Sequence, residues 1–127
     1  VDGARDVAKE IGSLTGGEGA DVVFELVGTK ETMTHSVSAL RKRGRLVLIG
    51  YSEDSLVLHP LQLVIGELTV TASVGNTYDE LLQAVALAAA GKIKAVVGRR
   101  VSLDQLPATL EALRRGEIVG RAVVTFE

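Results

Sequence analysis

Two apolar segments, each followed by a glycine, constrain the fold of this chain most strongly. The first runs from Asp21 to Val27 before Gly28, and the second is the strand from Arg45 to Gly50. Near-continuous apolar strands are typical of parallel sheets that are buried on both faces. The segment between them, Thr29 to Gly44, has helical spacing, so we expect a strand, a crossover helix and a parallel strand. The carboxyl ends of both strands then share one edge of the sheet, where open α/β sheets bind ligands.

The rest of the chain alternates in the same way. Apolar spacing, caps and breakers predict the following elements, given by residue numbers: a helix over 2–15 capped by Asp2, an extended piece over 56–58, a short helix over 60–65, a strand over 68–74, a helix after the Thr77 capping box, a strand over 95–103, a helix capped by Asp104 and a last strand over 121–126.

The spacing also predicts which side chains form the apolar and basic faces of these helices. In the helix that starts at Thr29, Met33, Val37 and Leu40 form the apolar stripe, and three basic residues occupy the last turn. The two later helices are expected to turn apolar residues inward. These expectations concern the following residues: Arg41, Lys42 and Arg43 in the basic turn, Leu81, Leu82, Val85 and Ala88 in the first later helix, and Leu106, Leu110 and Leu113 in the second.

Composition excludes several classes of function. The 127 residues carry a net charge of −2 and no cysteine, so phosphate-driven nucleic-acid binding is disfavoured, and disulfides and thiolate metal sites are excluded. No uninterrupted apolar run is long enough to span a membrane, and no signal peptide is visible, so we expect a cytoplasmic protein. The chain begins with Val1 and a helical pattern rather than a strand, which suggests a piece of a longer polypeptide.

Recognisable catalytic motifs are missing from the sequence. There is no zinc-binding histidine pair, nucleophile elbow or Walker sequence. His35 is interpreted as a partly exposed helical residue and His59 as part of a turn, while Asp21 and Glu25 have no obvious acid–base partner. The glycines at 16–19 follow a helix and precede a strand, the reverse of a dinucleotide-binding loop, so we interpret them as a connection. We therefore expect no catalytic residue and no metal ligand in this chain.

Small residues do recur at the ends of the predicted strands. Val27-Gly28, Gly50-Tyr51 and Ser73-Val74-Gly75 each follow a strand on the same predicted edge. Glycine allows a ligand to approach the backbone, and strand-end amides can bind polar groups of a ligand. Glycine also permits a simple turn, but three such ends on one edge favour a binding site.

These residues resemble the C-terminal part of the medium-chain dehydrogenase/reductase superfamily, the alcohol-dehydrogenase-like enzymes. The resemblance rests on four stretches, Gly19 to Gly28, Leu40 to Gly50, Leu103 to Pro107 and Leu113 to Val124, and on their order and spacing. It implies an α/β fold: the late half of a Rossmann-type parallel sheet flanked by helices, followed by a segment that returns to the catalytic domain in relatives. The implied boundary separates residues 1–75 from residues 76–127.

The resemblance also implies a function, hydride transfer between an alcohol and a carbonyl with NAD or NADP. By similarity, the cofactor would contact ten residues: Leu26, Val27 and Gly28 near the ribose, Ile49, Gly50, Tyr51, Ala72, Ser73 and Val74 around the nicotinamide, and Arg121 at the pyrophosphate. Relatives pair across a sheet edge, which implies a homodimer through Leu56 to Leu58 and Leu68 to Val74.

Several segments that define the family are missing from this sequence. The Gly-x-Gly-x-x-Gly turn, the residue that selects NAD or NADP, and the domain with the zinc ligands are not in this sequence, so zinc would come only from absent residues. We therefore expect weak or no cofactor binding and no activity from the 127 residues alone. Two alternatives remain at this point, a fragment of an S-adenosylmethionine-dependent methyltransferase and a non-catalytic dimerising α/β module.

Overall fold

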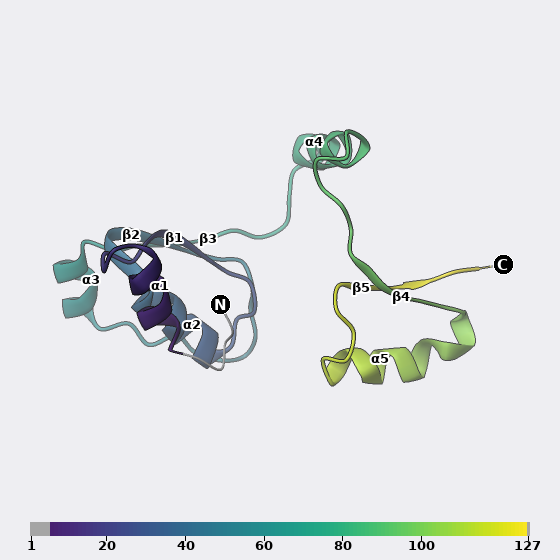
Figure 1. The fold of residues 1–127 in the computed structure, drawn as a ribbon, viewed down its shortest axis with the longest axis horizontal. Coiled ribbons are helices and arrows are strands. Elements are labelled where there is room, and N and C mark those ends of the chain that lie inside the picture. The colour runs from purple at the N-terminus through teal and green to yellow at the C-terminus, as the bar shows by residue number, and fades with distance from the viewer. Residues whose placement is uncertain (1–5, 127) are drawn as a thin grey trace. The chain divides into compact units, whose positions relative to one another are not determined.

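The computed structural model describes residues 6–126, which divide into two compact units. The first unit extends to Gly75 and the second begins at Asn76. Figure 1 shows the elements of both, coloured along the chain. Each unit is described by itself below.

The first unit is built on a three-stranded parallel sheet. Its strands are β1 (Ala20–Glu25), β2 (Leu40–Leu48) and β3 (Thr69–Ala72), in the order β1-β2-β3. Glu25 is aligned with Leu48, and Leu48 with Ala72, so the three carboxyl ends meet at one edge. The predicted strand–helix–parallel strand is therefore confirmed, and with it the α/β fold class.

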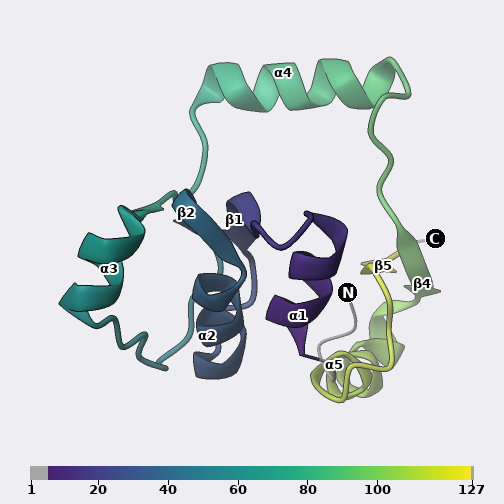
Figure 2. The same cartoon turned by 60° about the vertical axis from the view of Figure 1, so that its left-hand side comes forward.

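Three helices accompany this sheet, α1 (Val7–Leu14), α2 (Lys30–Ser38) and α3 (Pro60–Gly66). In Figure 2, α2 lies between α1 and α3. The buried Met33 and Val37 of α2 and the fully buried Leu46 of β2 form the core of the unit. Because side chains alternate along a strand, Val23 and Glu25 of β1 share the face that carries Leu46.

The opposite face of the sheet corrects the expectation of burial on both sides. Val22 and Phe24 of β1 are 45% and 62% exposed. The described residues provide a cover for only one face.

The helix predicted from Thr29 to Gly44 ends much earlier. Thr29 is the N-cap as expected, but α2 stops at Ser38, and β2 already begins at Leu40. The basic residues expected in a last helical turn lie in this strand, where Arg43 has a left-handed φ of 64°. Arg41 pairs with Asp21, while Lys42 and Arg43 both pair with Glu67. The ion pairs and the β1 ladder replace the predicted last turns of the helix.

Two predicted helix caps also change. The predicted cap Asp2 lies outside the described residues, and the side chain of Asp6 caps α1 by accepting a hydrogen bond from the Lys9 amide at 3.2 Å. Asp104 is not a cap, because Ser102 caps the turn Leu103–Gln105 through a capping box with Gln105, and Gln105 is the N-cap of the following helix. The predicted capping box of Thr77 and Glu80 is confirmed.

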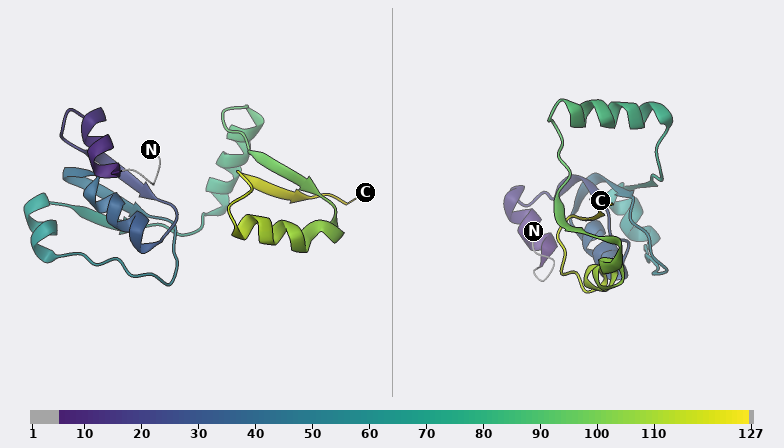
Figure 3. Two further views of the ribbon diagram at one scale, coloured as in Figure 1. Left: turned by 60° about the horizontal axis from the view of Figure 1, so that its bottom comes forward. Right: turned by 90° about the vertical axis from the view of Figure 1, so that its right-hand side faces the viewer.

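The second unit contains helix α4 (Tyr78–Ala89), strands β4 (Val97–Val101) and β5 (Arg121–Val124), the 3₁₀ turn η1 (Leu103–Gln105) and helix α5 (Leu106–Arg114). The two strands pair in parallel, and Figure 3 shows α5 alongside them. The last strand is therefore paired with β4, a partner that local sequence patterns do not predict.

The expected inward faces of α4 and α5 are wrong for the described chain. Leu81, Leu82 and Val85 are 48%, 49% and 57% exposed, and every residue of α4 is exposed. In α5, Thr109 and Ala112 are buried, whereas Leu110 and Leu113 are 56% and 39% exposed. The pattern correctly predicts amphipathic helices, but the described residues do not supply the surface that would cover their apolar faces.

Candidate functional site

A hollow of about 480 Å³ lies where the three strands of the first unit end. It is lined by Gly28, Met33, Leu48, Ile49, Gly50, Tyr51, Ser52, Asp54, Leu56, Ala72, Ser73 and Val74. We call it the strand-end hollow. Its position is the edge at which open α/β sheets bind ligands.

The structure brings seven of the ten predicted site residues together here. They are Gly28, Ile49, Gly50, Tyr51, Ala72, Ser73 and Val74. Leu26 and Val27 line a different hollow of about 570 Å³, beside Val7 and Ile11 of α1. Arg121 belongs to the second unit, where its side chain is exposed and its amide donates to the Val96 carbonyl at 2.8 Å.

The two strand-end glycines have a packing role that does not require a ligand. Gly28 has a φ of 84°, and a Cβ there would lie 2.5 Å from the Tyr51 Cα. A Cβ at Gly50 would lie 2.2 Å from the Leu26 carbonyl carbon. The backbones after β1 and β2 touch, and only glycine permits this approach. Turn formation and close packing therefore account for both glycines.

Most amides at these strand ends are already bonded within the chain. Both the Val27 and the Gly28 amides donate to the Glu25 carboxylate. The Ile49 and Gly50 amides donate to the Glu25 carbonyl at 2.8 and 2.9 Å, and Ser73 donates to the Leu48 carbonyl. The expectation that strand-end amides stand ready for a ligand is thus wrong for these five.

Several amides of the strand-end hollow remain for a ligand, among them those of Tyr51 and Val74. Within residues 6–126, the N–H groups of Tyr51 and Val74 donate no hydrogen bond. Both residues are strongly exposed, at 85% and 88%, so water reaches these groups. A ligand with an acceptor oxygen can replace that water, while Ile49 and Leu56 offer apolar surface.

Glu25 is the functional-site residue that sequence reasoning undervalued. Its side chain is only 2% exposed, and its carboxylate also accepts a hydrogen bond from the Thr32 hydroxyl at 2.8 Å. Burial by itself raises the pKa of Glu25, but the hydrogen bonds from Gly28, Thr32 and Val27 outweigh it and lower the pKa below the ordinary glutamate value. The available signal was a carboxylate inside an apolar strand, three residues before a glycine.

Hydrogen bonds connect the loop after β2 to the turn between β1 and α2. The Ser52 hydroxyl donates to the Gly28 carbonyl at 2.7 Å, and the Asp54 carboxylate accepts from the Lys30 amide at 2.9 Å. Asp54 thereby satisfies one of the free amides at the start of α2. The loop forms one wall of the strand-end hollow through Ser52 and Asp54.

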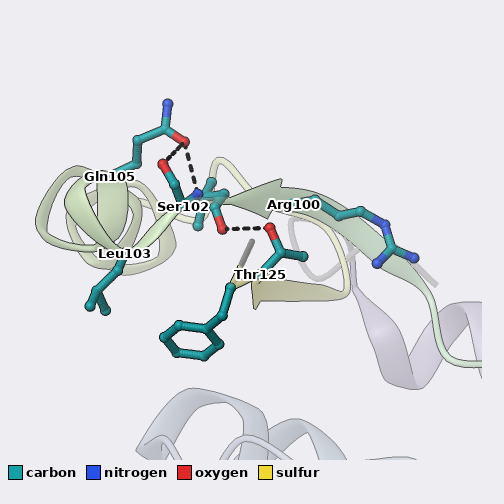
Figure 4. A pocket seen from close by; sticks show the side chains of 7 residues that line it. Arg100, Ser102, Leu103, Gln105 and Thr125 are labelled. Atoms are coloured by element: carbon teal, nitrogen blue, oxygen red, sulfur yellow. Dashed lines mark hydrogen bonds between the residues drawn. The ribbon is translucent and has the colours of Figure 1, made fainter.

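A second hollow, of about 470 Å³, lies in the second unit, where Arg100, Ser102, Leu103, Gln105 and Thr125 line it (Figure 4). Its polar groups mostly bond to one another. Ser102 donates from its amide and hydroxyl to the Gln105 side chain, each at 3.1 Å, and the Thr125 hydroxyl donates to the Val101 carbonyl. This internal pairing occupies Ser102 and Thr125, whereas the Arg100 guanidinium has no bonded partner within residues 6–126.

The remaining candidates for chemistry are weaker. His35 is a half-buried residue of α2, as expected, and His59 is the exposed N-cap of α3. Across residues 6–126, no cluster of three or more His, Asp or Glu side chains is arranged to hold a metal ion. In that same part of the chain, no helix combines the length and apolar character needed to cross a membrane.

With this geometry established, comparison with known proteins defines the class. Residues 1–90 match the model of the family described as zinc-binding dehydrogenase. The match covers most of the chain, so the chain belongs to the zinc-binding dehydrogenase family. This membership confirms the resemblance drawn from the sequence and argues against a methyltransferase fragment.

Individual relatives are dehydrogenases. The chain is 28% identical over 121 residues to an NAD-dependent alcohol dehydrogenase of Sulfurisphaera tokodaii, covering 95% of this chain and 35% of the relative. It is 29% identical over 121 residues to a D-arabinose 1-dehydrogenase (NADP(+)) of Saccharolobus solfataricus, covering 95% of this chain and 34% of that protein. The relatives thus include both NAD- and NADP-dependent enzymes.

A solved structure agrees with the fold over nearly the whole chain. The alcohol dehydrogenase of the hyperthermophilic archaeon Aeropyrum pernix superposes with a TM-score of 0.92 at 33% identity, covering 99% of this chain and 36% of that one. The chain therefore spans about a third of the length of the relatives it matches.

The residues present fit a nicotinamide better than they fit a metal. The strand-end hollow combines apolar side chains with unbonded amides, among them those of Tyr51 and Val74, a suitable set for a flat ring that carries an amide group. A zinc ion finds no comparable donor set among the described residues. No step involving zinc is derived for this chain.

Proposed function

We propose that this chain is the later part of the cofactor domain, residues 1–75, and the C-terminal segment, residues 76–127, of an NAD(P)-dependent alcohol-dehydrogenase-like oxidoreductase. The complete protein would transfer hydride between a small alcohol and the corresponding carbonyl compound. The observation that carries the proposal is the strand-end hollow at the carboxyl ends of β1, β2 and β3.

The chain's own contribution is to bind and orient the cofactor. Ile49, Tyr51 and Val74 supply the wall against which the nicotinamide packs, and the Tyr51 and Val74 amides donate to its amide oxygen. The bound cofactor supplies the site that accepts or gives the hydride. Since hydride transfer depends on close approach and alignment, a fixed ring position is the main catalytic benefit this chain provides.

Other predicted residues enter the proposal with separate roles. Leu26 and Val27 line the hollow of about 570 Å³ beside α1 in the first unit, which suits contact with another part of the cofactor. Arg121 is exposed and makes no ion pair within residues 6–126, so its guanidinium is available for a charge-assisted contact with the pyrophosphate.

We further propose that the complete protein is a homodimer formed through the outer edge of β3. In the described residues β3 pairs only with β2, and all four of its residues are exposed. An unpaired strand edge is a template for pairing with a second copy. Leu56 to Leu58 and Leu68 to Val74 would form this surface.

The test uses the full-length protein that contains this region, mixed with NAD⁺ or NADP⁺ and a series of small primary and secondary alcohols. The proposal predicts reduced cofactor in step with carbonyl product. Replacing Val74 with Pro removes the proposed donor and should raise the KM for cofactor about 10-fold. A folded full-length dimer without activity towards any alcohol or carbonyl would instead favour the non-catalytic dimerising module.

A further inference from the structure

We propose that Glu25 is a positioning residue: it holds the segments after β1 and β2 in the arrangement that receives the cofactor. This inference rests on the proposed function and adds a residue that acts through the backbone segments of the cofactor site. It is drawn from the hydrogen bonds and burial around Glu25.

The Glu25 side chain organises the turn that follows β1. Its Oε1 accepts from the Val27 amide at 3.1 Å and from the Gly28 amide at 3.0 Å, and its Oε2 accepts from Gly28 at 2.8 Å. The Thr32 hydroxyl in the first turn of α2 donates to Oε1 at 2.8 Å. A carboxylate that accepts several such bonds fixes the path of the turn, because each bond involves a charged acceptor.

The main chain of the same residue organises the segment that follows β2. The Glu25 carbonyl accepts from the Ile49 amide at 2.8 Å and from the Gly50 amide at 2.9 Å. One residue therefore bonds four amides that belong to two different strand ends. Both segments line the hollows of the proposed cofactor site.

Close packing couples these two segments mechanically. Gly28 lies against the backbone of Tyr51, and Gly50 against that of Leu26. The Ser52 hydroxyl adds a bond to the Gly28 carbonyl. Because backbone meets backbone without an intervening side chain, a shift of the Gly28 turn displaces Tyr51, whose amide is one of the two proposed donors.

The chemistry of the acceptor explains why a carboxylate occupies this position. The partners of the side chain are all donors: two amides and one hydroxyl. Glutamine has the same shape but one oxygen fewer, and an NH₂ group in place of Oε2 would face the Gly28 amide, a donor that it cannot satisfy. Since Glu25 is almost fully buried, water cannot replace the lost acceptor.

The experiment measures steady-state kinetics of the full-length protein carrying Glu25→Gln. We expect the KM for cofactor to rise about 10-fold while the KM for alcohol stays at the parental value. Partial unfolding would give a different result, because a smaller active fraction lowers the apparent kcat and leaves both KM values unchanged. The matched control is Glu31→Gln, an exposed glutamate in the first turn of α2.

Thr32 provides a milder second pair of variants in case Glu25→Gln does not fold. Thr32→Val removes one bond to the carboxylate and should raise the cofactor KM about 3-fold, whereas Thr32→Ser keeps the hydroxyl and should restore the parental value. Parental cofactor KM values in both Glu25→Gln and Thr32→Val would overturn the positioning role while leaving the proposed function intact. A parent protein without cofactor-dependent activity would contradict the proposed function, and the positioning role would fall with it.

Discussion

The Gly28 backbone lies so close to Tyr51 that a Cβ at Gly28 would stand 2.5 Å from the Tyr51 Cα. The same glycine has a φ of 84°, a conformation that side-chain-bearing residues rarely adopt. Two independent reasons therefore require glycine at position 28: its positive φ and the close approach of the Tyr51 backbone.

Replacing Gly28 with Ala should destabilise the first unit by about 2–4 kcal/mol, since backbone strain and steric overlap add. Gly16→Ala is the matched control, because Gly16 also has a positive φ, of 64°, but open space around it. It should cost only about 1 kcal/mol. Urea unfolding measures both values, and equal shifts of the two midpoints would show that the contact with Tyr51 is unimportant.

The start of α4 should depend on pH through Glu80. Its carboxylate accepts hydrogen bonds from the Thr77 amide at 2.6 Å and from the Thr77 hydroxyl at 2.9 Å, which lower the pKa of Glu80. A lowered folded-state pKa stabilises the helix start above the ordinary glutamate pKa, and this contribution is lost as the pH falls through the folded value.

Residue-resolved amide exchange of Thr77 measures this effect. Protection should fall on acidification in the parent chain, and Glu80→Gln should remove the pH dependence. Asp79→Asn, a change in the same turn at a residue that makes no bond to Thr77 in the described structure, is the control. An unchanged acid response in Glu80→Gln would assign it to another group.

Glu67 forms ion pairs with two neighbouring basic residues of β2, Lys42 and Arg43, at the protein surface. Hydrogen bonds from Lys42 and from Arg43 lower the pKa of Glu67. Lys42→Met should therefore raise this pKa towards the ordinary glutamate value, whereas Lys30→Met, which removes a lysine that does not contact Glu67, should leave it unchanged. NMR titration of the Glu67 side chain follows both variants. Because the cluster is exposed, added salt should reduce the difference.

The isolated 127 residues should bind NAD(H) weakly or not at all. The chain lacks the Gly-x-Gly-x-x-Gly turn that binds the pyrophosphate at a helix N-terminus in dinucleotide folds. Isothermal titration calorimetry of the chain with NADH and with NADPH tests this directly. Tight binding of either cofactor would show that the strand-end hollow suffices without that turn.

Local sequence patterns predicted the structure well where each element carries its own signal. The strand before Gly28, the Thr29 cap and the capping box of Thr77 all depend on neighbouring residues, and the structure confirms them. The predicted end of α2 was wrong because Leu40 fits the apolar stripe of a helix as well as it fits the first position of a strand. Only pairing with Ala20 of β1, a long-range contact, decides between the two.

The candidate site was predictable in outline but not in its hydrogen bonding. The topology brings Gly28, Gly50 and Ser73 to one edge, and apolar runs alone indicated that. No pattern reveals that Glu25 takes up four of the amides there. Its side chain bonds the Val27 and Gly28 amides after its own strand, and its carbonyl bonds the Ile49 and Gly50 amides after β2, which come close only in the folded chain. The inward faces predicted for α4 and α5 failed for a related reason, since burial depends on surfaces outside the helix.

The central claim is that the strand-end hollow receives the nicotinamide. It is tested most directly by determining the structure of the full-length protein with NAD(H) or NADP(H) bound. The account predicts the nicotinamide ring against Ile49 and Tyr51, with its amide oxygen within hydrogen-bond distance of the Val74 amide. A cofactor bound with its nicotinamide away from these residues would contradict the account.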